Sequence, residues 1–123
     1  MIKLIRDSKR SIQLKFDILG ANRLIEAFNK ALMEKDDNTL QVDCLEAFGK
    51  KKCSPYLTIM KGESALSKTE TGGVLSLEEG DLEYGKEKLL EAIEEGYIEP
   101  AEFTRIMTNK SQNIDDLFWE LLI

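Results

Sequence analysis

The sequence predicts an α+β domain in which helices pack on an antiparallel sheet of about four strands. Two patterns predict this class. Short segments alternate apolar and polar residues, as half-buried strands do, and longer segments place apolar residues every three or four positions, as amphipathic helices do. The chain of 123 residues has the length of one ordinary domain. We therefore expect residues 1–123 to form a single domain with the element order β-α-β-β-β-α-α-α.

The first strand and the first helix are predicted within residues 11–35. The segment SIQLKFDI alternates, with Ile12, Leu14, Phe16 and Ile18 on one face. The preceding MIKLI either begins the same strand or forms a strand of its own, with a break in the polar residues 6–10. From Gly20 to about Lys35 the period becomes helical. The apolar face of this helix is Leu24, Ile25, Phe28, Ala31 and Leu32.

The middle of the chain predicts three more strands and a second helix. The runs TLQVDC, YLTIMK and GVLSLEE are rich in β-formers and separated by turn residues, so we expect them to continue the antiparallel sheet. Residues 84–95 have helical periodicity, with Leu89, Leu90 and Ile93 on one side and carboxylates on the other. Gly96 is a natural end for this helix.

The C-terminal part predicts two short helices. Residues 99–102 resemble a helix start, with a proline and acids in the first turn, and the helix would carry Phe103, Ile106 and Met107. Asn113 can cap a last helix. Its apolar face would be Ile114, Leu117, Phe118, Leu121 and Leu122. Because so short a helix is unstable alone in water, it must dock on the body or on a partner.

The predicted core combines the apolar faces of these elements. It consists of Leu14, Phe16, Leu24, Phe28, Val42, Leu57, Ile59, Leu77, Leu89 and Ile93. Cys44 shares the alternating face of Leu40 and Val42, so we expect a small buried side chain rather than a reactive thiol. Cys53 lies in a loop beside three lysines that could lower the pKa of its thiol, and we expect a reduced cysteine there rather than a reactive one.

The chain contains no histidine, which removes the commonest general base, the commonest metal ligand and both standard nucleophile–histidine arrangements. Two pairs of adjacent carboxylates, Asp36–Asp37 and Asp115–Asp116, could do acid–base work. The first pair lies in a turn and the second in the first turn of a predicted helix, where acids are ordinary. We therefore expect no enzyme, no metal and no cofactor. An enzyme that uses carboxylates alone is the rival interpretation.

Other kinds of site are not indicated. The spacing of EEGDLEYGKE does not match a calcium loop, and the glycines fit no phosphate loop. The net charge of −6 disfavours binding to nucleic acid, and the basic cluster at residues 50–52 is short. No apolar run reaches the length of a membrane span, and MIKLIRDSKRS lacks the apolar run of a secretory signal. We expect a cytoplasmic protein.

Negative charge is concentrated between Glu78 and Glu102, where ten acidic residues against two lysines give a net charge of −8. Residues 1–62, in contrast, carry 12 basic and 8 acidic side chains, a net charge of +4. In the predicted helix, Glu87, Glu91 and Glu95 repeat at i,i+4 spacing, where like charges repel. A solvated helix face is the simplest interpretation. A sequence selected only for stability would mix the signs, however, so we favour a surface that meets a cationic protein.

The order of these elements resembles a known group of proteins. The strand IQLKFDI, the helix GANRLIEAFNKAL, the strands TLQVDC, YLTIMK and VLSLEE, the acidic helix EYGKEKLLEAIEEG and a closing helix resemble immunity proteins of bacterial polymorphic-toxin and contact-dependent growth inhibition systems. The resemblance covers most of the chain and rests on element order and charge. It implies a protein that binds one cognate toxin, often a nuclease, and blocks it without catalysis. Because no motif fixes an equivalence, it implies no particular site residues.

We therefore predict that the chain neutralises a basic toxin domain, with a ribonuclease as the expected activity, by covering the active-site cleft with an acidic surface. Direct contact with nucleic acid or membrane is not expected, and we expect a monomer rather than a dimer. The alternative is a non-catalytic homodimeric adaptor or structural protein that pairs through the C-terminal helix with Trp119 exposed. The predicted partner-binding residues are Glu79, Asp81, Glu83, Tyr84, Glu87, Glu91, Glu94, Glu95 and Tyr97.

Overall fold

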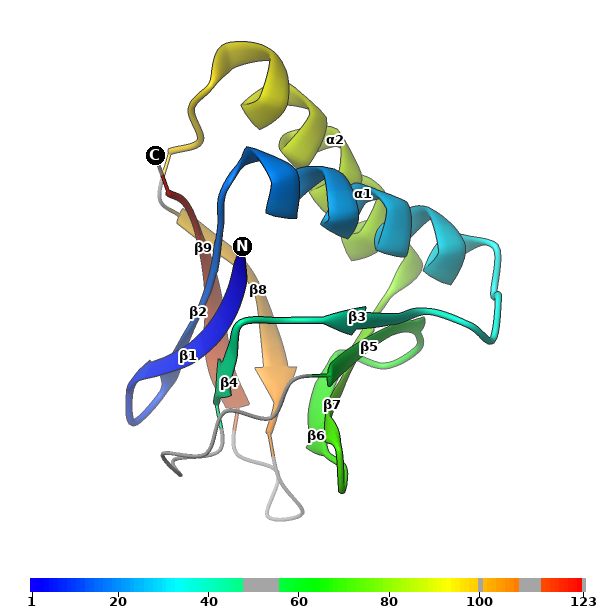
Figure 1. Ribbon diagram of the computed structural model, residues 1–123. Coiled ribbons are helices and arrows are strands. Elements are labelled where there is room, and N and C mark those ends of the chain that lie inside the picture. Colours follow the sequence, from blue (N-terminus) through cyan, green and yellow to red (C-terminus); the bar gives the residue numbers. More distant parts are fainter. Residues whose placement is uncertain (48–55, 100, 109–113, 123) are drawn as a thin grey trace.

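The computed structural model describes residues 1–47, 56–99, 101–108 and 114–122, and these residues form nine strands and two helices (Figure 1). The helices are α1 (Ile18–Leu32) and α2 (Glu79–Glu95). The strands are β1 (Ile2–Ser8), β2 (Ser11–Phe16), β3 (Thr39–Gln41), β4 (Cys44–Glu46), β5 (Tyr56–Lys61), β6 (Ala65–Lys68), β7 (Gly72–Leu77), β8 (Ala101–Met107) and β9 (Ile114–Leu121).

The strands form one mixed sheet in the order β3-β5-β7-β6-β8-β9-β2-β1-β4. Strand pairs β1–β2, β3–β5, β6–β7 and β8–β9 are antiparallel, whereas β1–β4, β2–β9, β5–β7 and β6–β8 are parallel. The prediction of an antiparallel sheet of about four strands with three further helices after it is therefore wrong. The domain combines helices with a sheet, but the sheet is larger and mixed.

The sheet curls, because strands next to each other in the sequence lie at its opposite edges. β3 and β4 are separated only by Val42 and Asp43, yet they are the first and last strands of the sheet. Figure 1 shows β3 running beneath α1 toward β4. Asp43 fixes this corner to β1, since its carboxylate accepts a hydrogen bond from the Ile2 amide (2.9 Å) and its amide donates to the Ile2 carbonyl (2.9 Å). The predicted single strand TLQVDC is thus divided into two.

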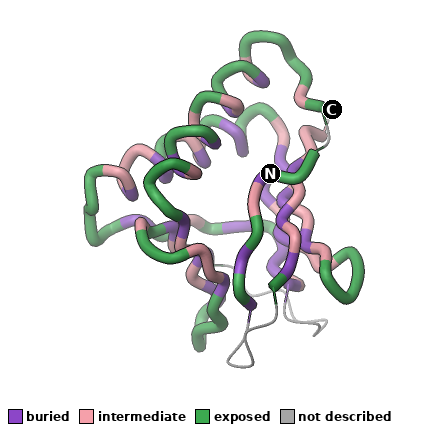
Figure 2. Tube along the Cα trace, turned by 180° about the vertical axis from the view of Figure 1, so that it is seen from behind, coloured by how far each residue is buried: buried purple, intermediate pink, exposed green. Residues whose placement is uncertain are grey.

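The two helices lie side by side along the same side of the curled sheet (Figure 1). α1 packs against β2, β3, β5 and α2, and α2 also packs against β8. Figure 2 shows buried residues recurring along both helices and along the strands. All the predicted core residues are buried except Ile93, which is half-buried and packs against the core. Cys44 is buried as expected, whereas Cys53 lies outside the described residues.

The N-terminal elements follow the sequence patterns closely. MIKLI belongs to a separate strand, β1, which forms a hairpin with β2 through the turn at Lys9 and Arg10. Asp17 accepts a hydrogen bond from the Gly20 amide (2.7 Å) and caps α1. Because of this cap, Ile18 begins the helix instead of continuing the strand.

The two predicted C-terminal helices are the strands β8 and β9, and both corrections have local causes. In β8 the register shifts between Glu102 and Thr104, so Phe103 is an extra, bulged residue. The bulge lets Phe103 and Ile106 both point inward, although an odd separation places residues of a regular strand on opposite faces. In β9 the inward face begins with a buried carboxylate, that of Asp115, and this polar residue conceals the strand alternation.

Candidate functional site

The acidic segment forms α2, and one side of this helix is anchored in the core. Leu82, Gly85, Leu89 and Ala92 are buried, at the spacing of one helix face. The helix ends at Gly96, which takes the left-handed conformation (φ 69°) and donates its amide to the Ala92 carbonyl (2.8 Å). The carboxylates are thereby held on the remaining sides.

The predicted partner-binding residues lie on two sides of α2. The first group is exposed along the outer side of the helix and consists of Glu79, Glu83, Glu87 and Glu94. Leu90, predicted to be on the buried side, lies among them with 46% of its surface exposed. Asp81 is apart from both groups, because it is half-buried and accepts a hydrogen bond from the Thr104 hydroxyl (2.9 Å) on β8. Asp81 therefore connects α2 to the sheet.

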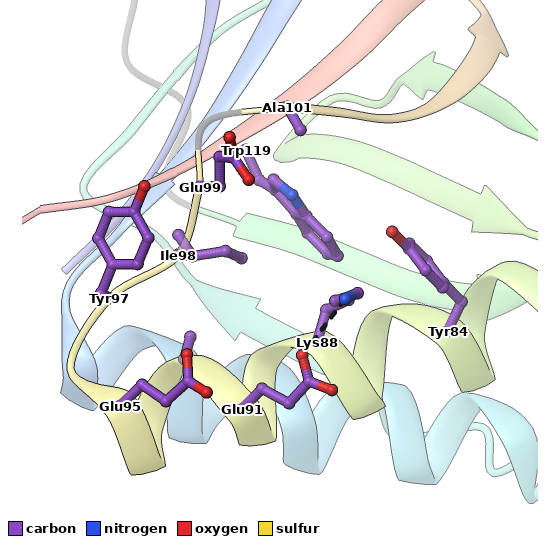
Figure 3. Close-up of a pocket in the computed structure, with 10 residues that line it drawn as sticks. Tyr84, Lys88, Glu91, Glu95, Tyr97, Ile98, Glu99, Ala101 and Trp119 are labelled. Atoms are coloured by element: carbon purple, nitrogen blue, oxygen red, sulfur yellow. Dashed lines mark hydrogen bonds and ion pairs between the residues drawn. The ribbon is translucent and has the colours of Figure 1, made fainter.

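The second group lines a cleft of about 280 Å³ between α2, the segment after it and β9. We call it the α2–β9 cleft, and it is lined by Tyr84, Lys88, Glu91, Ala92, Glu95, Tyr97, Ile98, Glu99, Ala101 and Trp119. Figure 3 shows side chains from α2 pointing toward Trp119, with Tyr84 at one end of the cleft and Tyr97 at the other. The structure thus brings together four of the predicted residues, namely Tyr84, Glu91, Glu95 and Tyr97.

Lys88 is held within the cleft by a carboxylate and an aromatic ring. Its ammonium donates a hydrogen bond to Glu91 Oε2 (3.3 Å) and lies 5.8 Å from the centre of the Tyr84 ring. The hydrogen bond and charge of Glu91 raise the pKa of Lys88 above its ordinary value of 10.5. Lys88 is therefore a cation at every physiological pH.

A stack of four aromatic side chains connects the cleft to the core. Trp119 stacks on Phe103 with ring centres 4.4 Å apart and planes inclined by 7°. Phe103 in turn stacks on Phe28 of α1 (6.3 Å), and Tyr84 stacks on Trp119 (6.0 Å). Because this stack runs from the core to the surface, the floor of the cleft is fixed by core packing.

Lys88 and Trp119 were not among the predicted site residues. In the sequence, Lys88 is only one of the two lysines that offset the ten acidic residues of 78–102. The adaptor alternative exposes Trp119 on a C-terminal helix, but Trp119 is 2% exposed and belongs to β9. The helix through which this alternative would pair is therefore a strand. The sequence does contain a signal for Lys88. It lies four residues after Tyr84 and three before Glu91, and at these spacings side chains meet on a helix.

The remaining carboxylate candidates do not form a site within the described part of the chain. Asp36 and Asp37 are exposed, and Asp115 is buried in contact with Arg6. Across the described ranges, no group of three or more His, Cys, Asp or Glu side chains is arranged to hold a metal ion. Neither helix in those ranges is long and apolar enough to cross a membrane.

Comparison with known proteins gave no relative: no family model, no curated protein and no solved structure matches the chain. The class of protein must therefore be inferred from the fold and the surface of this chain. Its described residues form two helices and a curled, mixed nine-stranded sheet, with an acidic cleft beside α2.

Proposed function

We propose that this protein binds a basic protein partner through α2 and acts without catalysis. The observation that carries the proposal is the exposure of the carboxylates on α2. We call this surface the acidic face and define it as Glu83, Glu87, Glu91, Glu94 and Glu95, all of which are exposed. Within the described residues, the ion pair found for this face is the one between Glu91 and Lys88.

The acidic face lowers the stability of its own helix in two ways. Glu87, Glu91 and Glu95 are spaced at i,i+4, where each like-charge pair costs a few tenths of a kcal/mol. Glu94 and Glu95 also lie at the C-terminal end of α2, where the helix dipole disfavours negative charge and the last turn has no basic residue. The Lys88–Glu91 pair offsets only part of this cost, because its side chains are 40% and 48% exposed and water weakens the attraction. A cationic partner would offset the rest.

The partner that fits this surface is a toxin domain with a basic active-site cleft, with a ribonuclease as the leading case. Proteins that cut nucleic acid need positive charge to hold phosphates, and a carboxylate-rich face can occupy the same cleft and exclude the substrate. Of the two features on which the resemblance to immunity proteins rests, the negative charge lies exposed on α2, whereas the predicted closing helices are the strands β8 and β9. Exposed carboxylates at the rim would mainly raise the association rate, whereas a carboxylate desolvated against arginine or lysine would slow dissociation.

Growth protection tests the proposed function directly. The toxin would be sought in the gene immediately upstream of the gene for this chain, as a large secreted protein with a basic C-terminal domain. Cells that express this C-terminal domain should stop growing, and co-expression of this chain should restore growth. The triple substitution Glu87→Gln, Glu91→Gln and Glu95→Gln should fold normally, since it removes like charges, but should lose protection. The mechanism would be contradicted if the triple variant protected cells as well as the wild type does and bound the toxin domain as tightly at both low and physiological salt.

A further inference from the structure

Lys88 reveals what kind of group the α2–β9 cleft accepts. Its ammonium occupies the end of the cleft near Tyr84, where it contacts the aromatic ring (5.8 Å to the centre) and the Glu91 carboxylate (3.3 Å). Figure 3 shows this lysine pointing into the cleft on the side facing Trp119 and Tyr84. An aromatic face beside a carboxylate is the usual environment for a bound cation. The cleft thus holds one cation that the protein itself supplies.

The charge and size of the cleft allow a cation from outside to enter. Glu91, Glu95 and Glu99 line it against Lys88 alone, so three carboxylates and one ammonium give a net charge of −2. Glu95 and Glu99 are exposed. The volume of about 280 Å³ greatly exceeds the roughly 30 Å³ that one water molecule takes in the liquid. An extended side chain can therefore enter.

We infer that the α2–β9 cleft receives an arginine side chain of the partner, an inference that rests on the proposed function. The planar guanidinium would displace the Lys88 ammonium from the Tyr84 ring and stack there, and its fork of donors would reach the Glu91 carboxylate, while Glu95, farther along the cleft, adds to the negative charge that attracts it. Arginine fits better than lysine, because its flat cation stacks on aromatic rings and bonds two carboxylate oxygens at once. Lys88 then competes with the incoming arginine for the same groups.

The first experiment needs no partner and uses the single tryptophan of the chain as the reporter. The full-length protein is titrated with N-acetyl-argininamide and, as a neutral isostere, with N-acetyl-citrullinamide, while Trp119 fluorescence is recorded. The arginine compound should change the fluorescence saturably, with a Kd on the order of millimolar, and the citrulline compound should not. The Glu91→Gln/Glu95→Gln variant should lose the response. Equal responses to both compounds, or no saturable response to the arginine compound, would overturn the inference whether or not growth protection is observed.

The second experiment measures binding of the toxin domain by two matched double variants. Glu91→Gln/Glu95→Gln and Glu83→Gln/Glu94→Gln remove the same charge from the same helix, but only the first pair lines the cleft. The cleft pair should weaken binding by about tenfold or more through faster dissociation, and the outer pair by about threefold or less through slower association. Lys88→Met should slow dissociation, because it removes the competing cation. Equal losses of affinity for the two pairs would agree with the acidic face as the binding surface but would overturn the arginine site in the cleft. No loss of affinity for either pair would overturn both proposals.

Discussion

Asp115 is a buried carboxylate that connects distant parts of the chain. It lies on β9, is 2% exposed, and accepts hydrogen bonds from both terminal nitrogens of Arg6 on β1 (3.1 and 3.3 Å) and from the Thr108 hydroxyl after β8. Arg6 also donates to the Ala47 carbonyl (2.9 Å), beyond the end of β4. Burial by itself would raise the pKa of Asp115, but the hydrogen bonds from Arg6 and Thr108 and the charges of Arg6 and Arg10 outweigh it and lower the pKa below 3.8.

The lowered pKa makes Asp115 a source of acid sensitivity. A carboxylate whose pKa is lower in the folded state contributes stability that is complete above the unfolded value of 3.8 and is lost as the pH falls through the folded value. Asp115→Asn should reduce the free energy of unfolding at pH 7 by roughly 3–5 kcal/mol, because it leaves Arg6 unpaired, and should flatten the acid limb below pH 3.8.

The neighbouring Asp116 is the matched control for this substitution. It pairs with Arg105 (3.3 Å), but both side chains are well exposed, so Asp116→Asn should change stability by less than about 1 kcal/mol. Urea unfolding from pH 2.5 to pH 7 measures both effects. Identical pH profiles for Asp115→Asn and the wild type would show that the Arg6 contact contributes nothing to acid sensitivity.

At the scale of elements, the crossing of α1 and α2 depends on a glycine. A β-carbon on Gly85 would lie 2.5 Å from Phe28 Cε2 and 2.9 Å from Phe103 Cζ, so the two helices approach as closely as the missing side chain allows. The aromatic stack that connects the cleft to the core begins at this crossing, since Phe28 and Phe103 are its inner members. Helix packing and cleft geometry are therefore coupled.

Gly85→Ala should lower the free energy of unfolding by about 1–3 kcal/mol through overpacking. The higher helix propensity of alanine should offset up to about 1 kcal/mol of this loss. Gly80 on the same helix is the control, since a β-carbon there would have nothing within 4 Å. Gly80→Ala should be neutral or stabilising by up to about 1 kcal/mol. Denaturant unfolding of the two variants measures the difference, and equal stabilities would mean that the crossing can relax without cost.

The contrast between β5 and the C-terminal strands shows which elements can be predicted from the sequence. YLTIMK is regular, so β5 was predicted with its observed bounds, and α1 has a clear apolar face and a capping aspartate. β8 and β9 could not be recognised, because the bulge at Phe103 imitates helical spacing and the partner of the buried Asp115 lies 109 residues away. Long-range pairing overrides local pattern at both places.

The candidate site also has one part that can be predicted from the sequence and one part that cannot. The exposed carboxylates of α2 follow from counting charges along a helix, and that part was predicted. The cleft could not be predicted, because it needs Trp119 of β9 to lie beside α2, and this placement follows from the pairing of β9 with β2 and β8. A local pattern carries no information about which distant strand covers a helix.

At the scale of the whole molecule, stability should be highest at β9. This strand is paired on both sides, parallel to β2 and antiparallel to β8, whereas the three-residue strands β3 and β4 form the edges of the sheet. Amides paired on both sides of a strand open mainly through global unfolding, and edge amides open locally.

Hydrogen exchange followed by NMR tests this ranking with two leucines of similar burial. Leu117 on β9 and Leu45 on β4 are 0% and 2% exposed, so a difference between their amides reports strand pairing rather than side-chain burial. The Leu117 amide should exchange near the global limit and the Leu45 amide at least about tenfold faster. Equal protection would indicate that the whole curled sheet opens as one unit.

The central position of β9 also governs when this chain can fold during its synthesis. The strand lies between β2 and β8 in the sheet, yet it follows the other described elements in the sequence and is therefore synthesised after them. Until residues 114–121 emerge, β2 lacks its parallel neighbour and the stack on Phe103 lacks Trp119. Until then the N-terminal hairpin and α1 expose apolar surface, to which chaperones can bind. The acidic cleft becomes complete only after β9 has been translated.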